Sequence, residues 1–104
     1  MLEFHINDIE MLHACYMPFI DGGAIFIPSE QSVQLSESML VLLSFAELEK
    51  TAIIGEVVWI NYQSIAQRPK GFAIRLQGSQ GVAYQQHFEK ILMGKSSSHS
   101  SFTL

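Results

Sequence analysis

The side chains of this sequence with the most chemical potential are one cysteine and four histidines: Cys15, His5, His13, His87 and His99. Catalysis by such groups requires a nucleophile with a base in reach, a pair of carboxylates or a bound metal. Only His13 and Cys15 lie close together, and their two-residue spacing differs from that of a closed zinc site. The plainer interpretation places His13 on a helix surface and Cys15 in the core as a small hydrophobe.

Sequence motifs for catalysis or phosphate binding are also missing from the chain. It contains no Walker loop, no nucleophile elbow and no Gly-x-Gly-x-x-Gly segment. We therefore expect no enzyme, no cofactor and no metal site. A hydrolase or isomerase remains a hypothesis without a supporting set of residues.

The glycine pair Gly22-Gly23 directly after Asp21 is a second candidate for chemistry. Successive backbone N–H groups in such a turn can form a nest that binds an anion. A phosphate in a nest needs cations nearby, and the closest basic residue in the sequence is Lys50. We favour the alternative, a turn in which one or both glycines adopt a positive φ.

Composition and charge restrict the partners of the protein. Hydrophobic residues make up 48% of the 104 residues and charged residues 15%, so we expect apolar surface to remain after one core has formed. Six basic residues face ten acidic ones, giving a net charge of −4 that repels polyanions. Nucleic acids and anionic membrane surfaces are therefore not expected as partners.

The compartment follows from cysteine usage and from hydropathy. Cys15 is the single cysteine and cannot form an internal disulfide, and no charged-then-apolar leader opens the chain. No apolar run approaches the roughly 20 residues that cross a bilayer. We expect a cytoplasmic protein without direct membrane insertion.

Apolar periodicity indicates the elements that position these groups. Alternating or continuous apolar runs predict strands over residues 4–6, 24–27, 39–45, 51–60 and 72–76. Helical spacing predicts a short helix over residues 8–16, ended by Pro18, and a longer one from Ser79 to a C-cap at Gly94. In the strand over 51–60, alternation places Ile53, Gly55, Val57 and Trp59 on one face.

These elements predict a mainly β protein, a small antiparallel β-barrel with closed edges and a C-terminal helix across an opening or flank. Residues 1–94 form the predicted domain. We expect residues 95–104 to form a flexible, Ser-rich tail that ends in Phe102-Thr103-Leu104.

Three segments of the chain are familiar as a set: ACYMPFIDGGAIFIP at residues 14–28, GEVVWI at residues 55–60 and GFAI at residues 71–74. Over nearly the whole chain, this pattern resembles the type IV pilus assembly branch of the PilZ-domain superfamily. The resemblance implies a PilZ-type β-barrel with a C-terminal helix, in agreement with the predicted elements.

The wider superfamily binds cyclic di-GMP through an R-x-x-x-R segment ahead of the barrel and a [D/N]-x-S-x-x-G segment. The second segment aligns with Asp21, Gly22, Gly23 and Phe26, so Gly23 replaces the serine and Phe26 replaces the final glycine. Residues 1–21 contain four carboxylates and no arginine. Because arginines supply the paired hydrogen bonds to phosphate, we expect no binding of cyclic di-GMP.

The resemblance therefore implies a non-enzymatic adaptor of bacterial type IV pilus biogenesis and twitching motility. Its implied partners are the pilus-extension ATPase (PilB-like) and a degenerate EAL-domain receptor of cyclic di-GMP (FimX-like). Large apolar side chains in an exposed turn are typical anchors of an interface. The expected partner-binding residues are Tyr16, Met17, Pro18, Phe19, Ile20, Trp59, Phe102 and Leu104.

Each of these residues also has a structural interpretation. Tyr16 can pack its ring on the barrel and leave its hydroxyl in water. For Trp59 we give equal weight to a core position and to an interface position. Phe19, Ile20 and Phe26, with Ile27, are more typical of a core than of a contact. The alternative function is a sensor that binds cyclic di-GMP or another nucleotide through Arg68, Lys70 or Arg75.

Overall fold

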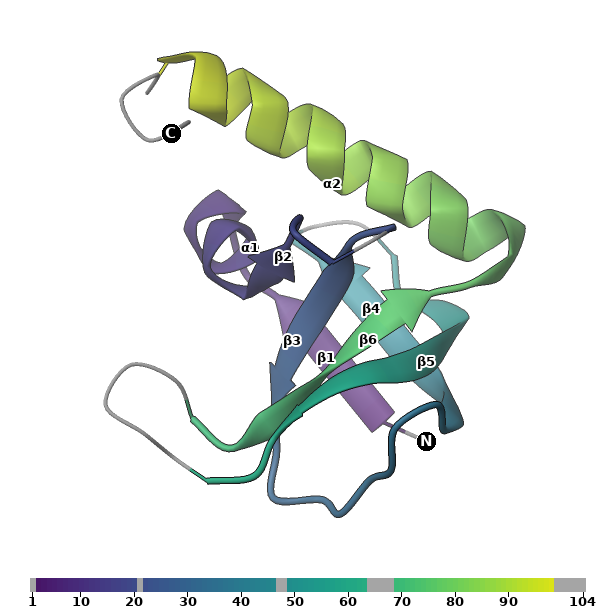
Figure 1. The fold of residues 1–104 in the computed structure, drawn as a ribbon. Helices are drawn as coiled ribbons and strands as arrows, with labels where there is room; N and C mark the ends of the chain where they lie inside the picture. The colour runs from purple at the N-terminus through teal and green to yellow at the C-terminus, as the bar shows by residue number, and fades with distance from the viewer. Residues whose placement is uncertain (1, 21, 47–48, 64–68, 99–104) are drawn as a thin grey trace.

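The computed structural model describes residues 2–20, 22–46, 49–63 and 69–98, and only the backbone of residues 94–98. Figure 1 shows its elements in chain order. They are β1 (Leu2–Ile6), α1 (Ile9–Cys15), β2 (Tyr16–Met17), β3 (Ala24–Pro28), β4 (Ser38–Phe45), β5 (Thr51–Asn61), β6 (Gly71–Leu76) and α2 (Gly78–Ser98). The predicted strands and the predicted short helix are therefore confirmed.

The strands form one curled sheet in the order β1-β4-β5-β6-β3-β2. Neighbouring strands are antiparallel except for β1, which pairs with β4 in parallel. Within the described ranges no pairing joins β1 to β2, so the sheet is a half-barrel with two edges. The expected fully antiparallel, closed barrel is wrong in this respect. Strand β2 ends where Pro18 removes a backbone donor, which limits its pairing.

The two helices, α1 and α2, make the fold mixed α/β, whereas a mainly β fold was expected. Asp8 caps α1, because its side chain accepts a hydrogen bond of 2.8 Å from the backbone N–H of Met11. Helix α2 crosses the end of the sheet where α1 and β2 also lie (Figure 1). Its Phe88 is fully buried and packs edge-on against Phe45, with ring centroids 5.7 Å apart. The helix thereby closes one end of the core.

The end of α2 differs from the expectation. The helix begins at Gly78 and continues through Gly94 to Ser98, so the predicted C-cap at Gly94 is wrong. One glycine costs a helix interior only about 1 kcal/mol and each serine about half of that, and the helix continues at this cost. Residues 99–104, including Phe102 and Leu104, lie outside the described residues.

Core side chains come from the concave side of the sheet and from both helices. The largest fully buried side chains are Phe72, Phe88, Ile6, Leu12, Ile25, Ile27, Leu43, Ile74, Val41 and Val57. Strand residues two apart share a face, which accounts for Val41 with Leu43 and for Phe72 with Ile74. Over the described ranges, no helix is both long and apolar enough to cross a membrane.

Candidate protein-interaction site

The glycine-rich turn connects β2 to β3 at the end of the sheet that α2 covers. The Gly23 N–H donates a hydrogen bond of 2.6 Å to the Ile20 carbonyl, and the Ile20 N–H donates one of 3.4 Å to Met17. Gly22 and Gly23 have φ values of 82° and 74°. The predicted turn with positive φ at both glycines is therefore confirmed, while Asp21 lies outside the described residues.

Tyr16 joins this turn to α2. Its hydroxyl donates a hydrogen bond of 2.6 Å to the Glu89 carboxylate, which also accepts one of 3.3 Å from the Gln85 amide. A Cβ on Gly23 would overlap the Tyr16 hydroxyl oxygen, so position 23 requires glycine for space as well as for φ. Burial, and then the bond to Glu89, raises the pKa of Tyr16. The turn is thus held against the helix by a neutral phenol.

The expected exposure of Tyr16 and Met17 is wrong. They are 7% and 2% exposed, because β2 pairs with β3 and brings both side chains into the packed region. Pro18 is exposed and Ile20 is half-buried against the core. Phe19 is 75% exposed, so of the expected anchors in this block it is the one that presents its ring to solvent. The core assignment of Phe26 and Ile27 is confirmed.

A β-bulge determines the side of the sheet on which Trp59 lies. Val57 pairs with the buried Ile74, but Trp59 pairs with Ala73, so the register shifts by one residue between them. Neighbouring residues of β6 face opposite sides, and Trp59 therefore lies on the convex side, away from Val57. The expected common face of Val57 and Trp59 is wrong for this reason.

On the convex side Trp59 is half-buried and contacts an aromatic neighbour. Phe26 pairs with Ala73 from β3, so Ala73 lies between Phe26 and Trp59 in the sheet. The two rings have centroids 6.1 Å apart at an angle of 53°, a range in which aromatic rings attract. Phe26 is thus covered although it does not face the concave core.

Arg75 lies beside the glycine turn, although it is not among the expected partner-binding residues. A Cβ on Gly22 would lie 3.4 Å from its Nε, so the guanidinium lies beside the glycine turn. Arg75 also forms an ion pair of 3.7 Å with Glu56, its register partner on β5. The available sequence signal was a single outward-facing charge in the apolar strand β6. Lys50, the nearest cation in the sequence, instead contacts Glu3 at 2.6 Å.

We use the name turn face for Phe19 and Gly22 in the turn, Arg75 beside Gly22, and Trp59 with the buried Phe26 ring packed against it. Its residues come from β3, β5, β6 and the turn, and they lie within or next to the sequence segments 14–28, 55–60 and 71–74. It presents one exposed aromatic ring, a half-buried tryptophan and a guanidinium beside a fixed turn. This combination is typical of a polypeptide contact, in which Trp and Arg are over-represented.

The cysteine and the histidines considered for catalysis have different surroundings where the structure describes them, and His99 lies outside the described residues. Within the ranges that the structure describes, no group of His, Cys, Asp and Glu could hold a metal. Cys15 is buried, which raises the pKa of its thiol to about 12, and His13 is exposed on α1. A hydrogen bond of 2.6 Å joins His5 to Ser44, but they are register partners on β1 and β4 and Ser44 is buried. Both residues line a hollow of about 380 Å³ together with Glu3, Phe4 and Lys50.

Comparison with known proteins adds no family or relative: no protein-family model matches the chain, and no curated protein matches it.

Proposed function

We propose that this protein is a non-enzymatic adaptor of type IV pilus biogenesis with a PilZ-type fold. In this proposal its turn face contacts the pilus-extension ATPase and a degenerate EAL-domain receptor of cyclic di-GMP. The proposed location is the cytoplasm, where the resemblance places such an adaptor. The family assignment depends on the resemblance of the three sequence segments.

The observation that carries this proposal is the 75% exposure of Phe19 on a turn that is fixed at both ends. A large exposed ring has no benefit for the stability of the isolated chain. The short Gly23–Ile20 hydrogen bond and the Tyr16–Glu89 contact hold the turn before any partner arrives. Such preorganisation reduces the ordering cost of binding.

A second set of contacts supports the proposed lack of cyclic di-GMP binding. The superfamily motif has glycine where this chain has Phe26, and a small residue there would leave room for a ligand. The Phe26 ring instead packs against Trp59 at 6.1 Å. No arginine precedes the turn in residues 1–20, so the motif's paired phosphate contacts have no equivalent there.

One observation favours the alternative function, a sensor that binds a nucleotide directly. Arg75 lies beside Gly22, so the turn has a cation next to it despite its distance in sequence. Lys70, a further candidate, forms an ion pair of 3.5 Å with Glu30, and Arg68 lies outside the described residues. Calorimetry with cyclic di-GMP separates the two functions. The adaptor predicts a dissociation constant weaker than about 100 micromolar, and tighter binding favours the sensor.

Co-purification with the extension ATPase and with the EAL-domain receptor tests the adaptor. Phe19→Ala should abolish capture of at least one partner while the chain stays folded, because Phe19 contributes little to its own fold. Leu35→Ala is the matched control, since Leu35 is also exposed, at 59%, but lies in the loop between β3 and β4. Capture of both partners by Phe19→Ala at the wild-type level would remove the turn face from the proposal.

A further inference from the structure

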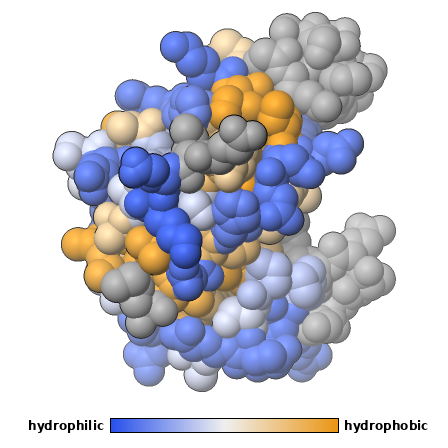
Figure 2. Space-filling view, turned by 180° about the vertical axis from the view of Figure 1, so that it is seen from behind, coloured by the Kyte–Doolittle hydropathy of each residue, from blue (hydrophilic) through white to orange (hydrophobic). Residues whose placement is uncertain are grey.

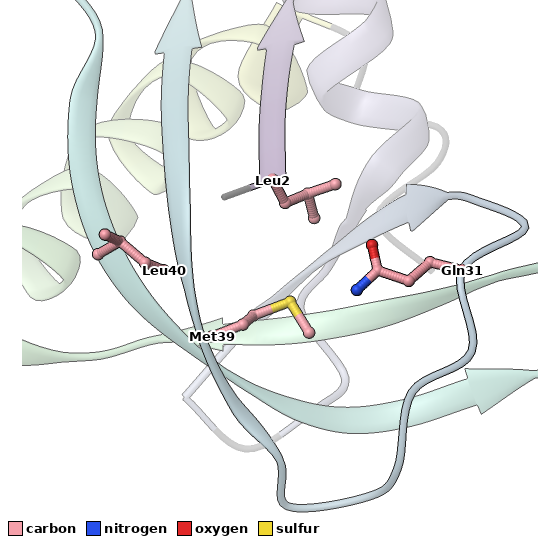
Figure 3. Close-up of a pocket in the computed structure, with 4 residues that line it drawn as sticks. All are labelled: Leu2, Gln31, Met39 and Leu40. Atoms are coloured by element: carbon pink, nitrogen blue, oxygen red, sulfur yellow. The ribbon is translucent and has the colours of Figure 1, made fainter.

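Strand β1 lies at one end of the sheet, and the edge that faces away from β4 has no strand paired to it within the described residues. At the start of this strand, Leu2 points toward Met39 and Gln31 across a hollow of about 400 Å³ (Figure 3). An unpaired strand edge presents backbone donors and acceptors that can pair with a strand of another chain. The sequence of β1 then decides which strand fits.

The pairing with β4 shows which backbone groups of β1 face the unpaired edge. The Ile6 carbonyl accepts a hydrogen bond of 2.8 Å from the N–H of Ala46, so Ile6 directs its backbone groups toward β4. Successive residues of a strand direct their N–H and C=O groups to opposite edges. Phe4 therefore also bonds to β4, and the backbone groups of Glu3 and His5 face the unpaired edge.

The usable part of this edge is short. Asn7, which follows β1, donates its N–H to the Sδ of Met11 at 3.4 Å. Among the hydrogen bonds of the described residues, none satisfies the backbone groups of Glu3 or His5 on this edge. Two N–H groups and two carbonyls are thus available to a strand that pairs along Glu3-Phe4-His5.

A second copy of β1 can pair with these groups in the antiparallel direction about a two-fold axis. An axis at Glu3 would place two carboxylates directly opposite each other, and an axis at His5 would place two imidazoles opposite each other. An axis at Phe4 places Glu3 of each copy opposite His5 of the other copy. The charges of β1 therefore favour the register centred on Phe4.

The same register satisfies the backbone. Glu3 of one copy and His5 of the other exchange both of their N–H···O=C bonds, and the two-fold axis repeats this pair. All the backbone groups that face the edge then have partners in both copies. Between the two pairs, the Phe4 residues face each other as a non-hydrogen-bonded pair, with Cα atoms about 4.5 Å apart and side chains in close contact.

The side chains of the central residues have capacity left for such contacts. The Phe4 ring is half-buried, so part of it can meet a second ring. His5 is bonded to Ser44 through Nδ1, which leaves Nε2 for a carboxylate. Glu3 is 59% exposed and contacts Lys50 through Oε2, which leaves Oε1. One Glu3 can therefore keep Lys50 and bond to His5 of a second copy.

The surroundings of β1 leave room for another chain. A hollow of about 380 Å³ adjoins the strand and is lined by Glu3, Phe4, His5, Ser44 and Lys50. The view from behind shows hydrophilic and hydrophobic side chains intermixed on the surface (Figure 2). A mixed surface favours a contact made by backbone bonds and polar pairs over one made by apolar area alone.

The net charge of −4 opposes the approach of two copies at long range. At an ionic strength of 0.15 M, exposed charges more than about 8 Å apart are largely screened. The contacts between Glu3 and His5 across the axis are shorter than this distance, because directly opposed residues lie about 5 Å apart. Local complementarity therefore outweighs the net charge at this salt concentration.

We propose that β1 pairs with β1 of a second copy of this chain as an antiparallel strand centred on Phe4. The two half-barrel sheets then form one continuous sheet, and each copy loses an unpaired edge. The surface lies at the opposite end of the sheet from β2, which leads into the turn face. The proposal goes beyond the adaptor function and does not depend on it.

Sedimentation equilibrium of the full chain in 0.15 M salt tests the dimer, from about 10 micromolar to about 1 millimolar protein. The proposal predicts a dimer with a dissociation constant below about 1 millimolar. His5→Glu should weaken it at least about tenfold, because carboxylates then oppose each other on both sides of the axis. His87→Glu is the matched control, since His87 is exposed on α2. A monomeric wild type at 1 millimolar would overturn the proposal.

A mixture of two variants tests the register. Glu3→Lys alone should also weaken the dimer at least about tenfold, because two cations then meet across the axis. When Glu3→Lys and His5→Glu chains are mixed, every opposed pair has opposite charge or joins Glu3 to His5. The mixture should therefore dimerise about as tightly as wild type, although each variant alone does not. Two folded variants that fail to associate with each other would contradict the register and the proposal.

Hydrogen exchange locates the contact and covers a variant that does not fold. The Glu3 and His5 amides should exchange at least about tenfold more slowly at 1 millimolar than at 10 micromolar protein, because only the dimer bonds them. Equal exchange rates in a dimerising chain would assign the dimer to another surface and overturn the proposal. If His5→Glu gives no dispersed NMR spectrum, Glu3→Lys alone decides, and wild-type dimerisation of that variant contradicts the proposal.

Discussion

The hydroxyl of Tyr16 donates a hydrogen bond of 2.6 Å to the carboxylate of Glu89, and this contact joins the β2–β3 turn to α2. Tyr16 is buried at 7% exposure, so its hydroxyl depends on this partner. Because Gly23 lies directly against the same hydroxyl, one side chain fixes both the turn and the helix. The exposed Phe19 is thereby held on a rigid support.

Removing the Tyr16 hydroxyl tests this support. Tyr16→Phe should lower the free energy of unfolding by about 1 to 2 kcal/mol, because a hydrogen bond to a charged acceptor is lost while the ring remains packed. Glu89→Gln should cost less, since the amide oxygen still accepts the bond. Urea denaturation of the three proteins measures the difference. A Tyr16→Phe chain within about 0.5 kcal/mol of wild type would show that the contact carries no stability.

Position 23 should tolerate alanine less well than position 22. Both glycines have a positive φ, which costs alanine about 1 kcal/mol. Gly23→Ala additionally overlaps the Tyr16 hydroxyl, so its loss of stability should exceed about 2 kcal/mol. Gly22→Ala is the matched control, because its Cβ would meet the Arg75 side chain at an ordinary 3.4 Å.

The overlap at position 23 can be separated from backbone strain by a double variant. Adding Tyr16→Phe to Gly23→Ala removes the oxygen with which the new Cβ collides. The losses of unfolding free energy in Tyr16→Phe and in Gly23→Ala, added together, should therefore exceed the loss in the double variant. Strict additivity in urea denaturation would mean that the hydroxyl does not restrict position 23.

The raised pKa of Tyr16 predicts a decline of stability at alkaline pH. The folded state holds the phenol neutral, so its contribution is complete below the ordinary tyrosine pKa of about 10 and is lost as the pH rises above that value. The free energy of unfolding should fall progressively as the pH rises above about 10 in the wild type. Tyr16→Phe should show a smaller fall over the same interval. Identical slopes in the two proteins would show that the Tyr16 phenol does not cause the decline.

Phe88 anchors α2 on the sheet, and its loss should be the most costly in the helix. It is fully buried against Phe45 and Tyr84, with ring centroids at 5.7 and 5.3 Å. Phe88→Ala should lower the free energy of unfolding by about 3 to 5 kcal/mol. Val82→Ala, at an exposed position of the same helix, should stay within about 0.5 kcal/mol of wild type. Similar losses in both variants would mean that the helix is not anchored through Phe88.

Local patterns were sufficient to predict most elements of the fold. The apolar runs over 39–45 and 72–76 match β4 and β6 within one residue at either end, and Asp8 caps α1 as expected. Periodicity could not reveal the parallel β1–β4 pair, which joins distant segments, or β2, which at two residues is too short to show alternation. Periodicity also could not reveal the bulge after Val57, because one extra residue does not change the apolar character of the strand.

The candidate site was predicted only in part, because it depends on tertiary contacts that local patterns do not contain. Phe19 and Ile20 are similar in sequence terms, but one is 75% exposed and the other packs on the core. Arg75 lies beside Gly22 through the pairing of β6 with β3, a relationship that spacing along the chain does not contain. Exposure and proximity are set by tertiary packing, so they required the structure.

The affinity of the chain for the purified pilus-extension ATPase, measured for wild type, Phe19→Ala and Leu35→Ala, tests the adaptor most directly. An anchoring ring contributes about 2 kcal/mol at the centre of an interface, so Phe19→Ala should raise the dissociation constant about 30-fold. Leu35→Ala should leave it unchanged. Equal affinities of all three chains, or no binding by the wild type, would contradict the adaptor function.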